Sequence, residues 1–383
     1  MVPRVKLYDL AKLYLRRRVE IDGAIQRVLE SGRVDWGDEV PCFESELAAW
    51  LGAKYCVTVN SGTAALRVAL LALGVGRGDE VILTPNVDIA SSSAVRSVGA
   101  DIVWVDVDPV TLTMDLGGLR AAIGPRTSAV MPIDLFGHPA RLMEILDIAH
   151  SKGLAVVEDA CLALGASIGN HAVGTISDIT CFSFTPSKHL GAYGSGGACV
   201  TADLNLADRM RKLSRYGQAR VHSQNTMVVG EVSQYETDGL NERLDEIQAA
   251  VLRVKLPDLT SSLASRIRQA HIYTSSLSSL AIETPVVLPE HVHAFRNFVV
   301  HSDNRDILRA RLAQEGIESA LSYSPPMHLQ PAYSSLGLKE GAFPNAENSC
   351  RRLIGLPIGP HLEDAQIGVV VQALRDIIGQ PES

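Results

Sequence analysis

Seven short apolar runs, separated by helix-like windows, constrain the fold of this chain more than any other feature of its sequence. Each run is bounded by Gly, Asp, Pro or Ser, as expected of a buried strand. TAALRVALLALG and ARLMEILDIAHSKG are two of the helical windows between them. Strands that alternate with helices in this way predict an α/β domain with a mostly parallel central sheet. The runs, from about Tyr55 to Val200, are CVTVN, EVILT, DIVWVDV, SAVMPID, AVVED, TCFSF and ACVT.

The remaining pattern divides the chain into three predicted parts. Residues 1–35 form a helix and an arm, residues 36–257 a large α/β domain, and residues 258–383 a smaller C-terminal α+β domain. The stretch NERLDEIQAAVLRVKLPDLTSSLASRIRQAHIYTSSL predicts a long helix that Pro257 breaks or kinks and that bridges the two domains. Residues 217–239 are polar and irregular, which predicts a long loop.

Charge and apolar content argue against several classes of partner. The net charge of -8 disfavours nucleic acid, which usually requires a basic face. The longest apolar stretch, Leu66–Gly76, contains Arg67 and is too short to cross a bilayer. The first residues contain no apolar signal-peptide core, so we predict a cytoplasmic protein. The six cysteines form no C-x-x-C pair, which favours free buried thiols over disulfides or a zinc site.

A glycine follows the first of the apolar runs almost directly. Ser61, Gly62 and Thr63 come after CVTVN and open a helical window. Glycine there lets backbone N–H groups approach a phosphate, and the start of a helix adds positive potential. The same residues also make an ordinary helix N-cap, which is the favoured interpretation of this stretch alone.

Two later strands end beside charged side chains. AVVED ends in Asp159, preceded by Glu158, and one of these carboxylates could partner a cationic group; a helix cap or a salt bridge is the alternative. Lys188 follows TCFSF, with Ser183 near the end of that strand. For a lone lysine, an exposed loop position is the simpler interpretation. Ligands of α/β sheets bind at the carboxyl ends of strands, so these groups are expected at one edge.

Taken together, these groups match what an enzyme that uses pyridoxal phosphate (PLP) requires. The phosphate needs an anchor, the pyridine nitrogen needs an acid that keeps it protonated, and a lysine must form the Schiff base. Aspartate suits the second role because its charge favours the pyridinium form. Lysine suits the third because its amine can be deprotonated when it is desolvated near another cation.

Further motifs extend along nearly the whole chain. They run from RVLESGRVDWGDEVPCFESELAAWLGAKYCVTVNSGTAAL through PIDLFGHPARLMEILDIAHSKGLAVVEDA and FSFTPSKHLGAYGSGGACVT to DGLNERLDEIQAAVLRVKL and FPNAENSCRRLIGLPIGP. With these motifs the chain resembles the DegT/DnrJ/EryC1/StrS family of sugar aminotransferases. The resemblance implies the PLP-dependent transferase fold of aspartate aminotransferase (fold type I). It also implies transfer of an amino group from L-glutamate or glutamine to a keto-sugar, mostly nucleotide-linked, in amino-sugar or antibiotic-type biosynthesis.

The resemblance assigns roles to individual residues. The family motif resembles S-F-x-P-x-K-N-L-G-A-x-G-D-G-G, which puts Lys188 in the place of the Schiff-base lysine and His189 in the place of the asparagine. Asp159 is implied to pair with the pyridine nitrogen. Residues implied to hold the phosphate are Gly62, Thr63, Ser183 and Asn241. The family's counterpart of Asn241 reaches the phosphate from the neighbouring subunit, which implies a homodimer with shared active sites; an N-cap of the following helix is its alternative role.

Substrate-side positions depart from the family pattern. Leu162 and Leu164 stand where E-D-A-A-Q-x-H-G-A has its glutamine and histidine. The segment PNVDIASSSAV lacks the usual aromatic that stacks on the pyridine, and Asp88 or Ile89 falls at that place. The keto substrate is therefore expected to be atypical. Candidate substrate contacts are Asp88, Tyr323, His328 and Arg243.

Four more positions differ from the family pattern. Asp134 replaces a histidine of the family, and Ser322 stands where H-Y-P usually begins. In FRNFVVHS, Arg296 and His301 nearly exchange the family's histidine and arginine.

Three rival functions remain open at this point. One offshoot of the family replaces the lysine with histidine and is a sugar dehydratase, so the retained Lys188 favours a transaminase. A cyclitol aminotransferase would ignore nucleotide sugars. A PLP-binding regulatory protein with a degenerate site is supported by Leu162 and Asp88 alone.

Overall fold

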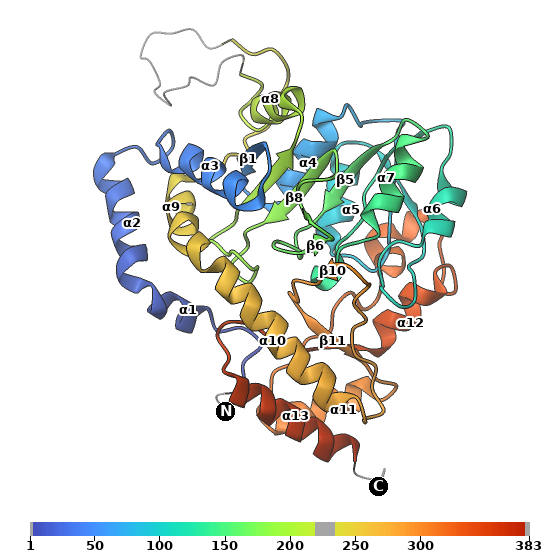
Figure 1. The fold of residues 1–383 in the computed structure, drawn as a ribbon. Coiled ribbons are helices and arrows are strands. Elements are labelled where there is room, and N and C mark those ends of the chain that lie inside the picture. The colour runs from blue at the N-terminus through green and yellow to red at the C-terminus, as the bar shows by residue number, and fades with distance from the viewer. Residues whose placement is uncertain (1–2, 219–233, 380–383) are drawn as a thin grey trace.

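A seven-stranded sheet forms the centre of the computed structural model, which describes residues 3–218 and 234–379 (Figure 1). Its strand order is β1-β9-β8-β5-β4-β2-β3. Strand β9 runs antiparallel to both neighbours, and the other neighbouring pairs are parallel. The strands are β1 (Tyr55–Val59), β2 (Glu80–Leu83), β3 (Asp101–Trp104), β4 (Thr127–Val130), β5 (Ala155–Asp159), β8 (Ile179–Ser183) and β9 (Gly197–Thr201).

Each of the seven apolar runs forms one of these strands, so the predicted mostly parallel sheet is confirmed. Both faces of the sheet are covered, because neighbouring residues of one strand pack in different hydrophobic clusters. In β2, Val81 and Leu83 belong to one cluster and Ile82 belongs to another. Burial on both faces is why these strands read as continuous apolar runs rather than alternating ones.

Helices cover the two faces, and polar side chains define where several of them begin. The Ser61 hydroxyl accepts a hydrogen bond from the Ala64 N–H at 3.1 Å, so Ser61 is the N-cap of α4. Asp88 caps α5 in the same way through the Ala90 N–H. These helices are α3 (Glu39–Leu51), α4 (Gly62–Ala72), α5 (Ile89–Ser97), α6 (Leu116–Ala122), α7 (Leu142–His150) and α8 (Leu204–Leu213).

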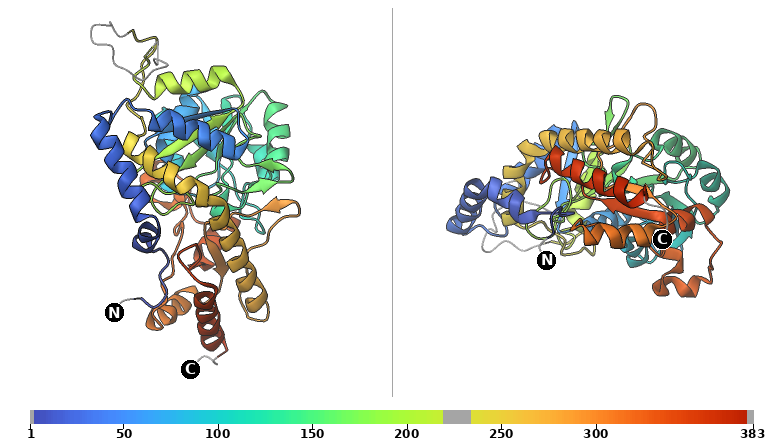
Figure 2. Two further views of the ribbon diagram at one scale, coloured as in Figure 1. Left: turned by 60° about the vertical axis from the view of Figure 1, so that its left-hand side comes forward. Right: turned by 90° about the horizontal axis from the view of Figure 1, so that it is seen from below.

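A long helical rod connects this layer to the C-terminal part of the chain (Figure 1). It consists of α9 (Glu246–Lys255), the 3₁₀ turn η2 (Leu256–Asp258) and α10 (Leu259–Leu277). The break that Pro257 predicts is this 3₁₀ turn, where the proline lacks the N–H of a regular helix. The rod packs against α3 at one end and against α13 (Asp364–Ile378) at the other (Figure 2).

The C-terminal part has its own small sheet and hydrophobic cluster. Strand β11 (Phe298–His301) pairs antiparallel with β12 (Leu353–Leu356). Helices α11 (Arg305–Gln314) and α12 (Pro344–Arg352) flank this pair. The three predicted domain ranges stay a prediction.

Two short helices and a second small sheet complete the description. Helices α1 (Leu10–Arg16) and α2 (Arg18–Ser31) form the N-terminal part, and α2 packs along α9. Strands β6 (Ser167–Ile168), β7 (His171–Ala172) and β10 (His291–Val292) form a three-stranded sheet. The predicted loop 217–239 falls mostly on residues 219–233, which lie outside the described residues. Within the described ranges, no helix is both long and apolar enough to span a bilayer.

Candidate active site

The carboxylate of Asp159 lies at the end of β5, where two groups hold it in place. It is 5% exposed. The Ser91 hydroxyl on α5 donates to its Oδ2 at 2.5 Å, and the backbone N–H of Cys161 donates to its Oδ1 at 3.2 Å. Both donors stabilise the ionised carboxylate and fix its direction. Asp159 is therefore a preoriented acceptor for a cationic group.

Glu158, the other candidate carboxylate, is bonded to buried hydroxyl groups. Its Oε2 accepts hydrogen bonds from the hydroxyls of Ser177 and Thr180 at 2.9 and 2.6 Å. Burial raises the pKa of Glu158, and it also raises the pKa of Asp134 well above its usual value, with the nearby charge of Glu158 adding to the effect. Glu158 thus belongs to a buried polar cluster, and among the described residues it forms no ion pair.

The start of α4 meets the ends of β5 and β8 at Gly62. A Cβ placed on Gly62 would lie 2.8 Å from Ser183 Cβ and 3.0 Å from Cys161 Sγ, so no side chain fits there. Thr63 follows in the first turn of the helix, and the Ser183 hydroxyl is 3.1 Å from that of Thr185. The structure therefore brings Gly62, Thr63 and Ser183 together beside the residues that follow Asp159, as the parallel order of β1, β5 and β8 requires.

Alanine at position 197 tests how tightly this turn is built. Its Cβ would meet the Ser61 carbonyl oxygen and lie 2.9 Å from the Gly62 nitrogen, both of which are backbone atoms. We expect Gly197→Ala to lower the free energy of unfolding by about 1–3 kcal/mol, as overpacking does, in urea denaturation. Gly368→Ala in α13 is the control, because its Cβ would meet nothing within 4 Å. That variant should gain about 0.5–1 kcal/mol, and equal effects of the two changes would contradict the prediction.

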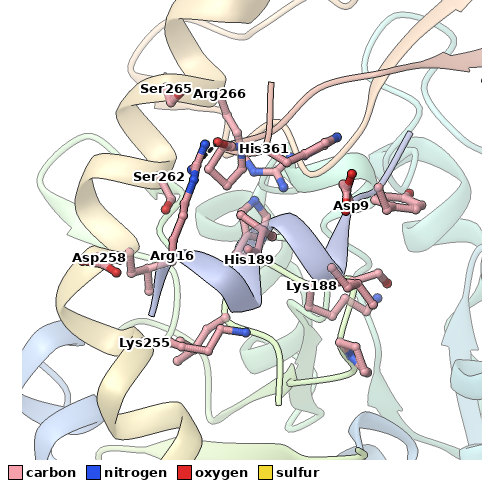
Figure 3. A pocket seen from close by; sticks show the side chains of 18 of the residues that line it. Asp9, Arg16, Lys188, His189, Lys255, Asp258, Ser262, Ser265, Arg266 and His361 are labelled. Carbon is pink, nitrogen blue, oxygen red and sulfur yellow. Dashed lines mark hydrogen bonds between the residues drawn. The ribbon is translucent and has the colours of Figure 1, made fainter. Parts of the chain in front are cut away.

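Lys188 lies in the turn after β8, and its ammonium form is disfavoured. Burial lowers its pKa, and the charge of Arg296 lowers it further, while Cys161, Asp159 and Asp88 act in the opposite direction. A depressed pKa is what a lysine needs to present a neutral amine to a carbonyl group. Lys188 also lines a cavity of about 270 Å³ between its own turn, α1 and α10 (Figure 3).

His189 fixes the position of this turn rather than facing a reacting group. Its Nε2 lies 3.0 Å from the carbonyl oxygen of Ala294, just before β11. Burial and the nearby charge of Arg266 lower its pKa well below the usual value, so the ring is neutral at pH 7. Of the two adjacent residues, only Lys188 therefore has the environment of a nucleophile.

Asn241 and Arg243 lie on the segment between α8 and α9. Asp245 is the N-cap of α9, so an N-cap role for Asn241 is wrong. Its exposed side chain stands beside the turn before α4, where its backbone carbonyl accepts from Asn60 Nδ2 at 3.4 Å. Arg243 pairs with Asp35 at 3.1 Å and lies 4.9 Å above the ring of Trp36.

Two of the other substrate candidates belong to the Lys188 neighbourhood. Asp88 is exposed at the start of α5, and its charge acts on Lys188. Burial raises the pKa of Tyr323, and the charges of Asp88 and Asp159 add to that effect. The Tyr323 ring packs 5.6 Å from that of Phe136.

His328, in contrast, is part of a buried pair. Its Nε2 is 3.0 Å from Glu347 Oε1, and its ring packs edge-on to Phe343. Glu347 also accepts from the backbone N–H groups of Gly341 and Phe343. These contacts hold the chain around η3 (Met327–Leu329) together and favour a structural role for His328.

Sequence reasoning missed three contributors to the site. Ser91 carried a weak signal, as a small polar residue just inside the helix that follows PNVD. Tyr8 carried none, because its place beside Arg296 is set by how the N-terminal arm folds back. Arg296 was visible only as an unusual residue in FRNFVVHS.

Comparison with known proteins places this arrangement among aminotransferases. Residues 16–375 match the model of the DegT/DnrJ/EryC1/StrS aminotransferase family. A dTDP-3-amino-3,4,6-trideoxy-alpha-D-glucose transaminase of Streptomyces venezuelae is 42% identical over 98% of this chain and 96% of its own. A UDP-2-acetamido-2-deoxy-3-oxo-D-glucuronate aminotransferase of Pseudomonas aeruginosa is 36% identical over 97% of this chain and 100% of its own. The crystal structure of DesV from S. venezuelae, 42% identical, superposes with a TM-score of 0.94 over 99% of this chain and 100% of that one.

Proposed function

The chain belongs to the DegT/DnrJ/EryC1/StrS aminotransferase family, and we propose that it moves the amino group of L-glutamate or glutamine to the ketone of a nucleotide-linked keto-sugar. PLP is the cofactor of this family. The observation that carries the proposal is the convergence of Lys188 and Asp159 at one edge of the sheet. A buried lysine with a lowered pKa and an oriented carboxylate are the two groups that PLP-dependent transamination requires.

The residues of the site fit PLP. Bound PLP supplies a carbonyl that condenses with an amine and a ring that accepts electrons from the substrate carbon. Lys188 would bind it covalently, and Asp159, held by Ser91, would keep the ring nitrogen protonated. Gly62, where a side chain cannot fit, would let the backbone approach the phosphate, and its neighbours Thr63 and Ser183 would add hydroxyl donors.

Lys188 would have a second task when it is not bonded to the cofactor. Its freed Nζ is suited to take the proton from the α-carbon of the donor, because burial lowers its pKa toward the working pH. The neutral amine accepts a proton, and the resulting ammonium can return it. The same group therefore serves as base and acid in both halves of the reaction.

Three further features of the proposal concern the acceptor and the assembly. The relatives named above act on dTDP- and UDP-linked sugars, which supports a nucleotide-linked acceptor. Asp88 and Tyr323 are the proposed contacts to that acceptor, because both lie within electrostatic range of the lysine or its partner. The exposed side chain of Asn241 supports a homodimer in which it reaches the phosphate of the other copy.

The visible spectrum of purified protein with PLP tests the first half of this reaction. We expect a yellow band from the lysine–cofactor bond, and L-glutamate should bleach it because the amino group passes to the cofactor. D-glutamate is the control and should leave the band in place. A band that persists with both L-glutamate and L-glutamine would contradict the proposed donor, and the absence of any band would contradict the cofactor site.

A further inference from the structure

Arg296 is a buried cation without an acidic partner. The residue is 4% exposed and forms no ion pair with any acid in the part of the chain that the structure describes. Its Nη1 donates to the hydroxyl of Tyr8 at 3.1 Å, and its guanidinium lies 4.7 Å above the ring of Tyr8. Its buried Nε has no hydrogen-bond partner. A buried charge is costly unless it is paired, so this guanidinium is prepared for an anion that the protein itself does not supply.

A second buried arginine holds the backbone of Arg296. Arg266 on α10 donates from Nη1 to the carbonyl oxygens of Phe295, Arg296 and Ile358 at 3.1, 3.3 and 3.2 Å. Arg266 is therefore satisfied by carbonyl groups and has a structural role. The side chain of Arg296 keeps free donors, while its main chain is fixed.

The position of Arg296 links it to the reacting lysine. Tyr8, on which it rests, lines the same cavity as Lys188. His189, the neighbour of Lys188, bonds to Ala294, two residues before Arg296. The charge of Arg296 also lowers the pKa of Lys188, after the larger effect of burial. The guanidinium thus lies within electrostatic range of the amine at which the substrate must react.

Other cations around the cavity already have partners. Arg16, beside α10 in Figure 3, donates to the carbonyl oxygen of Pro360 at 2.7 Å. Arg17 forms an ion pair with Asp258. Lys255 donates to the carbonyl oxygen of Gly191. Arg296 contacts the cavity wall only through Tyr8, but unlike these cations it keeps an unpartnered donor for a substrate anion near Lys188.

We propose that Arg296 binds the α-carboxylate of the amino-acid donor. This inference rests on the proposed transaminase function. In the first half of the reaction the amine of the donor would have to reach the cofactor carbon that Lys188 would hold. The α-carboxylate is attached to the carbon that bears this amine. A guanidinium presents two parallel N–H donors to a carboxylate, which fixes direction as well as charge.

Three amino donors test which carboxylate of glutamate Arg296 binds. L-Glutamate has both carboxylates, L-2-aminobutanoate retains only the one on the α-carbon, and 4-aminobutanoate retains only the distal one. Bleaching of the yellow band, or competition with L-glutamate, gives the half-saturating concentration of each. We expect Arg296→Met to raise this concentration about 30- to 4000-fold for L-glutamate and for L-2-aminobutanoate, the range for removal of one partner of a buried charge pair. The value for 4-aminobutanoate should change less than about threefold.

Other outcomes overturn the proposal. Equal weakening of 4-aminobutanoate would assign Arg296 to the distal carboxylate. If the half-saturating concentrations of all three donors were unchanged, Arg296 would be assigned to an anionic group of the sugar substrate instead. Loss of PLP affinity would assign it to the cofactor phosphate. If the wild-type protein bleaches with none of the donors, the proposed function itself fails, and that result is distinct from all of these.

Two further variants guard against a merely structural effect. Arg296→Lys retains the charge and should keep part of the affinity for L-glutamate. Arg268→Met on the exposed side of α10 removes a surface pair with Asp364 and a hydrogen bond to Ser265, and it should leave the values for all three donors unchanged. A pH titration of the yellow band gives a readout without a donor. Arg296→Met should move its midpoint to higher pH, because a positive charge near the lysine is lost, whereas Arg296→Lys should not.

Discussion

Alanine in place of Lys188 should abolish turnover, with a loss of at least about 10⁴-fold. The lysine is expected both to hold the cofactor and to move the proton at the substrate carbon, and a positioned acid–base group alone contributes about 10²–10⁴-fold. Burial lowers the pKa of Lys188, and an exposed lysine would lack this effect. The measurement is the rate at which 2-oxoglutarate is formed from L-glutamate with PLP present.

Two controls separate chemistry from charge. Lys188→Arg keeps a cation but cannot bond to the cofactor, so it should be as inactive as the alanine variant. Lys152→Ala, at an exposed position after α7, should have wild-type rates. Borohydride reduction followed by mass spectrometry should find the cofactor on Lys188. A near-normal rate for Lys188→Ala would mean that the assignment is wrong.

Alanine in place of Asp159 should reduce the rate by roughly 10²–10³-fold, the range for loss of one preorganised electrostatic partner. Its carboxylate is 5% exposed and held by Ser91 and by the Cys161 N–H, so its position is fixed. Without it we expect the ring nitrogen of bound PLP to lose its proton, and the cofactor to accept electrons less readily. The half-reaction with L-glutamate, followed by stopped-flow absorbance, measures the effect.

Asp159→Asn tests charge separately from shape. Its amide retains the size of the carboxylate but carries no charge, so its rate should fall nearly as far as that of the alanine variant. Asp147→Asn, exposed on α7, is the matched control and should be unaffected. An Asp159→Asn enzyme with wild-type kinetics would exclude the pairing with the ring nitrogen.

Local sequence patterns predicted the sheet and the general location of the site. Each strand is a short apolar run with turn residues at its ends, and that pattern does not depend on distant parts of the chain. Parallel strands present their carboxyl ends at one edge, so the sequence alone predicts that Asp159 and Lys188 lie close together. Their catalytic and binding roles stay predictions that the experiments above test.

Contacts between distant segments could not be predicted in the same way. The Ser91 hydroxyl reaches Asp159 only because α5 packs beside the end of β5. Tyr8 lies under Arg296 because the N-terminal arm folds back onto β11, and nothing in the local sequence at Tyr8 indicates this. The pairing of His328 with Glu347 could not be predicted either, because the two residues are 19 positions apart, and the role of His328 as a substrate contact stays a prediction.

The placement of β9 has a consequence for the order of events during synthesis. Strand β1 has no neighbour in the sheet other than β9, and Tyr55 pairs with Thr201. At about 5–20 residues per second, a ribosome needs roughly 7–30 s to make the chain between these two residues. For that time the turn at Ser61 and Gly62 lacks Gly197, against which it packs. A nascent chain therefore completes the packing around this turn, the proposed phosphate site, only after most of the sheet has already been translated.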